Sequence, residues 1–372
     1  MRLRSTATEP RPTWLELFFD LVFVVALAQL SHLLVHGATA TRFLEYFGMF
    51  VAVWFTWVGF TAYADRFDVD DATHRVLVLG AALANVVVAI HVDDAFSGGS
   101  APFAKATIAA RILLLAVTDR ARRGIPEARR FQTYYEAGWI AGLALWVASL
   151  LVPTPLRYAL WAAALAVEAG TPLLWRRRVA TVPLVSAHIA ERFGLFTIIV
   201  LGESVVSVAS GIAHVNFELG SSVVAVGTFV MAAMLWWVYF DCVTTVHADS
   251  PWYLYTHVFV YAGLGTVAPG ALLAILDADD AALPAGARAA LCGGVAVLLL
   301  ALAVIELTSR PPPAAQRRAA ARGLAGAAAI GLAFAGAALS PVATVLVLVA
   351  LVAADLGFEL ATLRLSSPAS AR

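Results

Sequence analysis

Apolar runs long enough to cross a bilayer follow one another along almost the whole chain. A transmembrane helix needs about 20 predominantly apolar residues, and twelve such runs predict an all-α integral membrane protein with about twelve transmembrane helices. Only 13% of the residues are charged, whereas soluble domains average about 25%. The predicted spans are residues 14–36, 43–63, 76–96, 102–118, 132–152, 156–175, 193–214, 220–243, 252–275, 289–308, 323–340 and 342–361.

Arginines are concentrated in alternate connections between these runs. With the N-terminus inside, the cytoplasmic segments contain twenty arginines, and the external segments contain only four basic residues: Arg42, Lys105, Arg157 and Arg288. Because cytoplasmic loops of membrane proteins carry an excess of basic residues, we expect the N- and C-termini to be cytoplasmic. The connection 310–322 is basic and rich in Pro and Ala, and we expect it to bind anionic lipid headgroups.

Polar and aromatic landmarks recur in the same order in the two halves of the chain. Six spans per half would make the halves parallel, related by an axis along the membrane normal. We therefore expect two parallel six-helix repeats, residues 1–178 and 179–372. The matched landmarks are Glu16 with Glu191, Phe18 with Phe193, Trp54 and Trp57 with Trp236 and Trp237, Gly142 with Gly331, and Glu168 with Asp355.

The first apolar run contains two carboxylates, Glu16 and Asp20. Charged side chains inside a membrane are costly and usually mark a functional site. Residues four apart share one face of a helix, so both acids face the same neighbours. Two interpretations stay open: they pair with arginines of neighbouring loops and fix the helix end, or they line an ion or proton pathway.

Three ionisable residues, His188, Glu191 and Arg192, lie just before the seventh span, and their spacing places them on one helical face. Further along, Glu203 and Ser204 lie near the middle of the span. A carboxylate at that depth must be protonated, paired or in contact with water. We expect these five residues to line a substrate or ion pathway, with Glu203 as the group that titrates.

Arg111, in the middle of the fourth span, completes the candidate pathway. It is the expected partner of Glu203, and Glu168 is a competing carboxylate. An ion pair of this kind would keep a buried charge compensated.

The densest polar cluster follows the second span and contains Asp68, Asp70 and Asp71. Carboxylates at this spacing suit a hard cation such as Mg²⁺, which proteins bind through one or two carboxylates together with substrate phosphates. The structural interpretation is a solvated loop that caps the next helix, with Asp71, His74 and Arg75 in one turn. Both interpretations stay open.

Aromatic residues gather around the end of the eighth span and the start of the ninth. Trp and Tyr are enriched where membranes meet water, so we interpret them as an interfacial belt and His257 beside them as structural. The aromatic residues are Trp236, Trp237, Tyr239, Trp252, Tyr253 and Tyr255.

Three motifs resemble the low temperature requirement protein A family: W-L-E-L-F-F-D-L-V-F-V-V-A-L-A-Q-L-S-H at 14–32, D-R-F-D-V-D-D-A-T-H-R at 65–75, and H-I-A-E-R-F-G-L-F-T-I-I-V-L-G-E-S at 188–204. The resemblance implies a multi-pass protein of the bacterial cytoplasmic (inner) membrane. The family name refers to a growth phenotype, so it supplies no substrate. The motif positions that it marks are Glu16, Asp20, Asp65, Asp68, Asp70, Asp71, His188, Glu191, Arg192, Glu203 and Ser204.

Two main functional hypotheses follow from these residues. The first is a secondary transporter or ion-coupled permease with a buried carboxylate site, which twelve spans and an apparent duplication favour. The alternative is an intramembrane enzyme acting on a lipid or isoprenoid, with Asp70, Asp71 and Glu203 as candidate acids. Only the enzyme would use a cofactor, Mg²⁺, held by Asp68, Asp70 and Asp71.

A membrane sensor or scaffold is a third hypothesis, which the lack of a soluble domain disfavours. The sequence contains no Walker A loop, dinucleotide-binding turn, CxxC pair or zinc signature. The expected partners are membrane lipids and a small-molecule, ion or lipid substrate, and we expect no nucleic acid.

Overall fold

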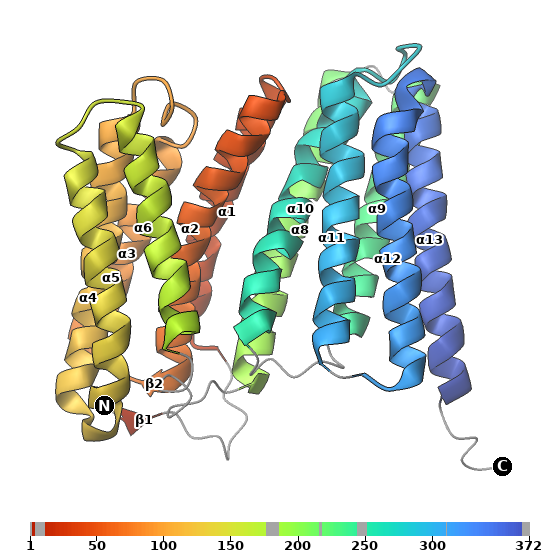
Figure 1. Cartoon of the computed structure of the whole chain (residues 1–372). Coiled ribbons are helices and arrows are strands. Elements are labelled where there is room, and N and C mark those ends of the chain that lie inside the picture. The colour runs from red at the N-terminus through yellow and green to blue at the C-terminus, as the bar shows by residue number, and fades with distance from the viewer. Residues whose placement is uncertain are drawn as a thin grey trace. The chain divides into compact units, whose positions relative to one another are not determined.

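The computed structural model describes residues 2–3, 12–175, 186–215, 218–243, 251–309 and 311–366. Within these residues the chain forms twelve α-helices (Figure 1), and each predicted span overlaps one of them. The helices are α1 (Trp14–Val35), α2 (Ala40–Arg66), α3 (Ala72–Ile90), α4 (Ser100–Gly124), α5 (Arg129–Ser149), α6 (Leu156–Leu174), α8 (Ser186–His214), α9 (Leu219–Val243), α10 (Pro251–Leu276), α11 (Ala285–Thr308), α12 (Pro313–Ala335) and α13 (Pro341–Ser366).

Ten of these helices are long and apolar enough to cross a membrane, so the chain is a polytopic membrane protein. The two that fall short are α5 and α6. Helix α5 begins with a polar stretch from Arg129 to Glu136, and α6 is 19 residues long and contains Arg157 and Glu168. The described residues therefore contain twelve helices, of which ten qualify as membrane spans by length and composition.

Short elements join some of the helices. A two-stranded antiparallel pair connects β1 (Arg2–Leu3) to β2 (Phe67–Asp68), which directly follows α2. Single 3-10 turns, η1 (Pro126–Ala128) and η2 (Gly336–Ala338), precede α5 and follow α12. Asp71 caps α3, because its carboxylate accepts the backbone N–H of His74 at 3.0 Å.

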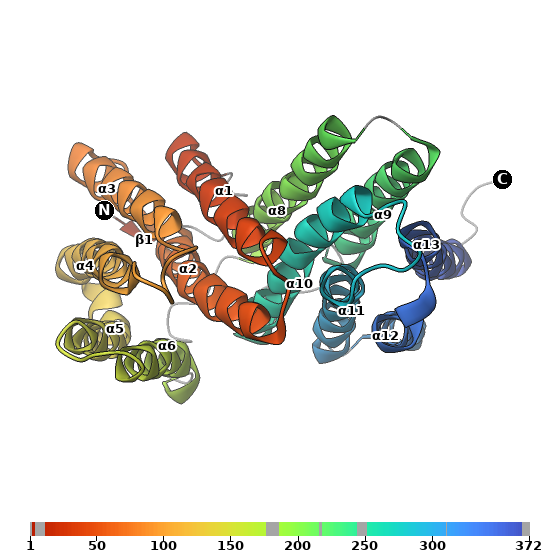
Figure 2. The same ribbon diagram turned by 90° about the horizontal axis from the view of Figure 1, so that it is seen from above.

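The helices form two compact units. Unit 1 contains α1 up to Leu30, α2 from Leu44, α3 to α6, and α8 up to Phe196. In it α3 packs on α4, α4 on α5, and α5 on α6 (Figure 2). Helices α5 and α6 lie close together because Gly142 has no side chain. A Cβ at that position would lie 2.8 Å from Cγ of Glu168.

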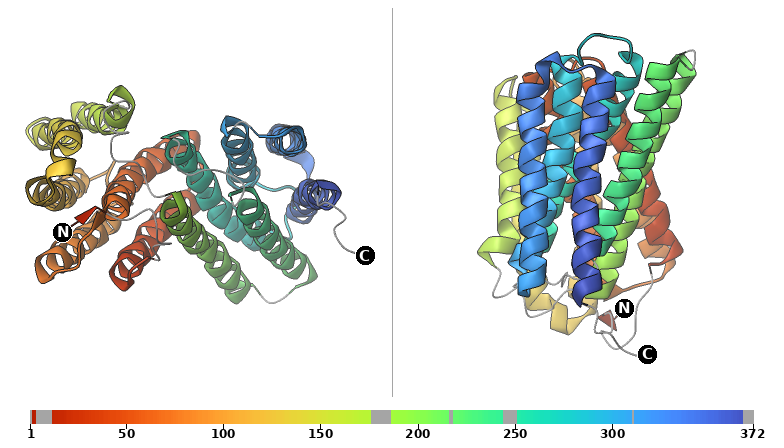
Figure 3. Two further views of the ribbon diagram at one scale, coloured as in Figure 1. Left: turned by 90° about the horizontal axis from the view of Figure 1, so that it is seen from below. Right: turned by 90° about the vertical axis from the view of Figure 1, so that its right-hand side faces the viewer.

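Unit 2 contains the remaining parts of α1, α2 and α8, with α9 to α13. Here α11 packs on α12, α12 on α13, and α13 on α9 (Figure 3). Helices α10 and α11 approach at backbone contact, since a Cβ at Gly270 would lie 2.6 Å from the amide nitrogen of Leu291. The expected boundary between two sequence repeats, 178/179, lies outside the described residues, and the repeat stays a prediction.

Candidate functional site

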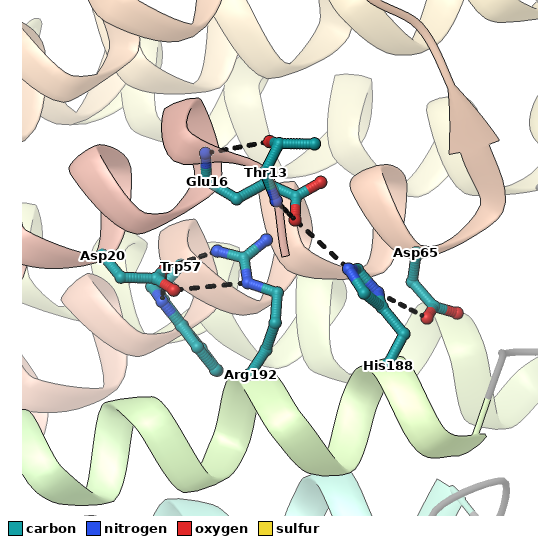
Figure 4. Close-up of polar contacts among 7 residues, drawn as sticks. All are labelled: Thr13, Glu16, Asp20, Trp57, Asp65, His188 and Arg192. Atoms are coloured by element: carbon teal, nitrogen blue, oxygen red, sulfur yellow. Dashed lines mark hydrogen bonds and ion pairs between the residues drawn. The ribbon is translucent and has the colours of Figure 1, made fainter. Parts of the chain in front are cut away.

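A buried histidine lies between two carboxylates in unit 1 (Figure 4). His188, in the first turn of α8, has its Nδ1 3.0 Å from Oδ1 of Asp65 and its Nε2 3.1 Å from Oε2 of Glu16. His188 and Asp65 are both 0% exposed, and Glu16 is buried. We call these three residues the carboxylate–histidine triad. It brings together α1, the last turn of α2 and the start of α8.

The contacts of the triad favour one extra proton. A neutral imidazole has one N–H donor and one acceptor nitrogen, whereas imidazolium has two donors. If both carboxylates were ionised and His188 neutral, one ring nitrogen would present its lone pair to a carboxylate oxygen, which is unfavourable. The contacts on both nitrogens are therefore best satisfied by imidazolium or by one protonated carboxyl group.

Glu16 also fixes the start of α1. Thr13 precedes the helix, its backbone N–H donates to Oε2 of Glu16 at 3.1 Å, and its Oγ1 accepts the backbone N–H of Glu16 at 3.3 Å. This reciprocal arrangement is a capping box, with Thr at the N-cap and Glu three residues later. Of the two interpretations that the sequence left open for Glu16, the structure supports a carboxylate that fixes the helix end, with His188 rather than an arginine as its partner, and the pathway stays a prediction.

An ion pair lies beside the triad. Arg192, one helical turn after His188, binds Asp20 through Nε at 3.3 Å and through Nη2. Asp20 also accepts the indole N–H of Trp57 at 2.7 Å, and the guanidinium lies 5.7 Å from the centre of that indole ring. The site therefore contains three buried carboxylates and one permanent cation.

The structure brings together four of the residues predicted for the pathway: Glu16, Asp20, His188 and Arg192. Glu191 shares their sequence motif, but its side chain is exposed. The sequence did not reveal Trp57 as the hydrogen-bond donor to Asp20. Its only signal was a tryptophan in the predicted second span, which corresponds to α2.

Arg111 lies in a separate buried pair of unit 1. Its guanidinium binds Glu168 through Nε at 3.1 Å and through Nη2 at 2.9 Å, and it also donates to Thr56. Glu168 accepts the indole N–H of Trp146 at 3.2 Å. The sequence suggested Glu203 as the partner of Arg111 and Glu168 as the competing carboxylate. In the structure Arg111 pairs with Glu168, so the expected pair with Glu203 is wrong.

Glu203 lies in unit 2, near the middle of α8. It is buried, it accepts a hydrogen bond from the side chain of Ser31, and His32 is the nearby titratable group. The adjacent Ser204 is buried too, and its hydroxyl has no hydrogen-bond partner among the described residues. These contacts place a second polar location on α8, distinct from the triad.

Two of the three aspartates in the acidic loop after α2 are paired with arginines. Asp70 binds Arg75 at 2.8 Å and Asp71 binds Arg120 through both oxygens at 2.8 and 2.9 Å. The Arg120 guanidinium and the His74 amide hold the pKa of Asp71 down at about 2, and Arg75 lowers the pKa of Asp70. Within the described residues, no three His, Cys, Asp or Glu side chains converge as metal ligands, Asp68 included.

The C-terminal helices of unit 2 contain an ionic network of their own. Arg322 binds Glu306 at 2.7 Å and Glu359 at 2.6 Å, and Arg318 binds Glu306 at 3.0 Å. All four are buried, as is the nearby Asp355. The expectation that the basic stretch 310–322 binds lipid headgroups is wrong for these two arginines, because α12 begins at Pro313 and turns them toward acids on α11 and α13.

A chain of hydrogen bonds links α8, α9 and α10 inside unit 2. Tyr239 Oη lies 3.2 Å from His257 Nε2 and 3.3 Å from Tyr261 Oη, and Thr197 donates to Tyr261 at 3.3 Å. The interpretation of Tyr239 and Tyr253 as an interfacial belt is wrong, since both are buried, whereas Trp236, Trp237 and Trp252 are exposed.

Comparison with known proteins agrees with the three sequence motifs. The profile of the family described as bacterial low temperature requirement A protein (LtrA) matches residues 11–354, which confirms the resemblance. The chain is also 30% identical over 248 residues to an uncharacterised protein of Rhizobium meliloti (strain 1021). That match covers 64% of this chain and 60% of the relative.

Proposed function

We propose that this chain, which belongs to the bacterial low temperature requirement A family, is a proton-coupled secondary transporter of the cytoplasmic membrane. The observation that carries the proposal is the buried His188, whose two ring nitrogens each lie at hydrogen-bond distance from a carboxylate oxygen, one of Asp65 and one of Glu16. Such a group exchanges a proton without contact with bulk solvent. Intramembrane chains of Asp, Glu and His are typical of proton relays in pumps and transporters.

The charge balance of the site supports proton coupling. Three buried carboxylates and one arginine lie in the site, and each proton that the triad binds raises the net charge of the site by one unit. Because an uncompensated buried charge is unfavourable, the loaded and unloaded sites favour different surroundings. That difference in free energy is what a transporter needs to couple proton binding to a change of conformation.

The acidic loop favours transport over the enzyme alternative. A metal–diphosphate site needs carboxylates that are free to bind the cation. Asp70 and Asp71 are each neutralised by an arginine instead. Glu16 and Asp65, by contrast, both contact His188, a partner able to exchange protons.

Twelve spans with cytoplasmic ends remain part of the proposal. Helices α5 and α6 have 21 and 19 residues, which at about 1.5 Å per residue gives about 30 Å, the thickness of the hydrocarbon core. The charged group that makes α6 less apolar, Glu168, is buried against Arg111. This pairing supports α5 and α6 as a hairpin that crosses the bilayer beside α4.

Proton flux in reconstituted vesicles tests the proposal. Purified protein would be placed in liposomes that contain a pH-sensitive dye, and alkali cations, amino acids and organic acids would be added in turn. We expect one solute class to move protons in the wild type. His188→Gln and Glu16→Gln should abolish this flux.

The matched control is Glu191→Gln, because Glu191 lies on the same helix as His188 but is exposed. It should keep the wild-type flux. A His188→Gln protein that transports like the wild type would remove the triad from the mechanism. A wild type that moves no protons with any solute class, while binding prenyl diphosphate, would favour the enzyme.

A further inference from the structure

We infer that a small cavity beside the triad holds one water molecule, which passes protons between His74 and Glu16. The inference rests on the proposed function, since it names the route by which protons reach the triad. The cavity has a volume of about 20 Å³ and lies in unit 1 among α1, α2, α3 and α8. A cavity holds a water when its volume exceeds about 10–15 Å³ and two to four polar groups surround it.

The walls of the cavity meet that condition. Four of the nine lining residues carry polar groups, and these are Glu16, Tyr63, His74 and Arg192. The guanidinium of Arg192 disfavours a cation in this space, and the carboxylate of Glu16 disfavours an anion. Water is neutral and both donates and accepts, so it suits walls that contain donors and an acceptor.

His74 supplies a second, independent observation. Its Nδ1 is buried and has no hydrogen-bond partner among the described residues, although the residue lines the cavity. A buried imidazole nitrogen without a partner is unfavourable, and a cavity water provides one. The ring is held in place by stacking on Tyr63, with 5.8 Å between centroids.

His74 also lies at the boundary of the protein. The residue is 9% exposed, and because Nδ1 is buried, that exposed surface belongs to the rest of the residue. In the inferred route, His74 takes up a proton on this exposed side and releases one from Nδ1 into the cavity. Proton shuttling of this kind is a common role of histidine.

Charged groups from several neighbouring elements lie near His74, and α2 contributes the titratable Tyr63. Asp70 and Asp71 precede it in the chain, and their arginine partners are Arg75 on α3 and Arg120 on α4. Glu16 comes from α1, and Arg192 from α8 lies across the cavity. Since Asp70 and Asp71 are each compensated by an arginine, Glu16 is the carboxylate that remains available to accept a proton from His74.

The transfer conserves protons at each step. His74 takes a proton from outside on Nε2 and becomes imidazolium, and it then gives its Nδ1 proton to the water while the water gives one of its own to the carboxylate of Glu16. Glu16 then returns to the carboxylate by protonating Nε2 of His188, and His188 passes its Nδ1 proton to Asp65. Both rings end neutral with the proton on Nε2 and the water is unchanged, so a ring flip or tautomer exchange resets each histidine for the next proton.

Infrared spectroscopy of the full chain in lipid nanodiscs tests this route. Exchange between about pH 5 and pH 8, where unperturbed histidine titrates, should change a carboxylic C=O band that is lost in Asp65→Asn, because Asp65 holds the proton at the end of the route. After a rapid pH jump, we expect His74→Gln to slow this change roughly 100-fold, as expected for the loss of a positioned proton-transfer group. The midpoint of the equilibrium titration should stay unchanged, and His74→Ala should be rescued by added imidazole.

Two further variants separate the outcomes. Val78 lines the cavity, so Val78→Leu should displace the water, slow the jump response and remove a water band that shifts in H₂¹⁸O. His91→Gln, at the other end of α3, should behave as wild type. Wild-type rates in both His74→Gln and Val78→Leu overturn the route but leave the triad intact. A wild type with no titrating carboxyl band contradicts the proposed function itself.

Discussion

The Arg111–Glu168 pair allows the strongest stability prediction. Both side chains are 0% exposed, and Arg111 cannot lose its proton in a protein. Glu168→Gln keeps the shape of the side chain and one acceptor oxygen, but it leaves the guanidinium without a counter-charge. Removing one partner of a buried ion pair costs about 3–5 kcal/mol. Because one acceptor remains, we expect the lower end, about 3 kcal/mol.

Thermal unfolding of the detergent-purified protein measures this effect. In soluble domains of 150–250 residues, each kcal/mol lowers Tm by about 2–4 °C, so Glu168→Gln should lower Tm by roughly 6–12 °C. Trp146 donates to Glu168, and the guanidinium lies 5.1 Å from the ring centre of Trp139. These two of the ten tryptophans add a local contribution to the fluorescence change on unfolding.

A double-mutant cycle tests the physical reason. Replacing both members of a buried pair by apolar residues of similar volume is often neutral, so Arg111→Met with Glu168→Met should be more stable than either single variant. The control Glu191→Gln, at an exposed position, should change stability by at most about 0.5 kcal/mol. The reasoning fails if Glu168→Gln is as stable as this control, or if the double variant merely adds the two single losses.

Three further outcomes follow from other contacts. Trp57→Phe removes the hydrogen-bond donor to the buried carboxylate of Asp20 and should lower the free energy of unfolding by about 1.5–3 kcal/mol. Thermal unfolding measures this change, and an unchanged Tm would contradict the hydrogen bond. Arg120 lowers the pKa of Asp71 to about 2 in the folded protein. The stability advantage of wild type over Asp71→Asn should therefore be constant above about pH 4 and disappear as the pH falls toward 2. A constant advantage down to pH 2 would refute the pairing. Gly270→Ala should cost about 1–3 kcal/mol by overpacking, whereas Gly293→Ala, with open space around its Cβ, should cost nothing.

The helices were readable from the sequence because each signal is local. Apolar runs of about 20 residues gave the positions of all twelve, and the four-residue spacings predicted which acids and bases share a face. The spacing 188–192 placed His188 and Arg192 together, and both lie in the site. The same rule included Glu191, which is exposed, because spacing does not determine how far a buried face extends around the helix.

The partners were not readable, because they depend on packing between distant segments. His188 and Asp65 are 123 residues apart, and nothing local indicates that their helices meet. The prediction of topology from the arginine count had the same weakness, because it treated arginines outside the predicted spans as loop residues. Arg322 is 0% exposed and bound to Glu306 and Glu359, so an arginine that looked like a loop cation stabilises a helical core. Buried arginines of this kind weaken any topology argument that counts them as loop residues.

The capping box at the start of α1 links chemistry to backbone order. One oxygen, Oε2 of Glu16, accepts both the Thr13 N–H and the contact from His188. A carboxylate is a stronger acceptor than a carboxylic acid, and a negative charge in the first turn also stabilises a helix through its dipole. When Glu16 takes up a proton, the first turn of α1 loses both contributions. Fraying of that turn is thus a backbone reporter of the protonation state, which amide hydrogen exchange at residues 14–17 can follow.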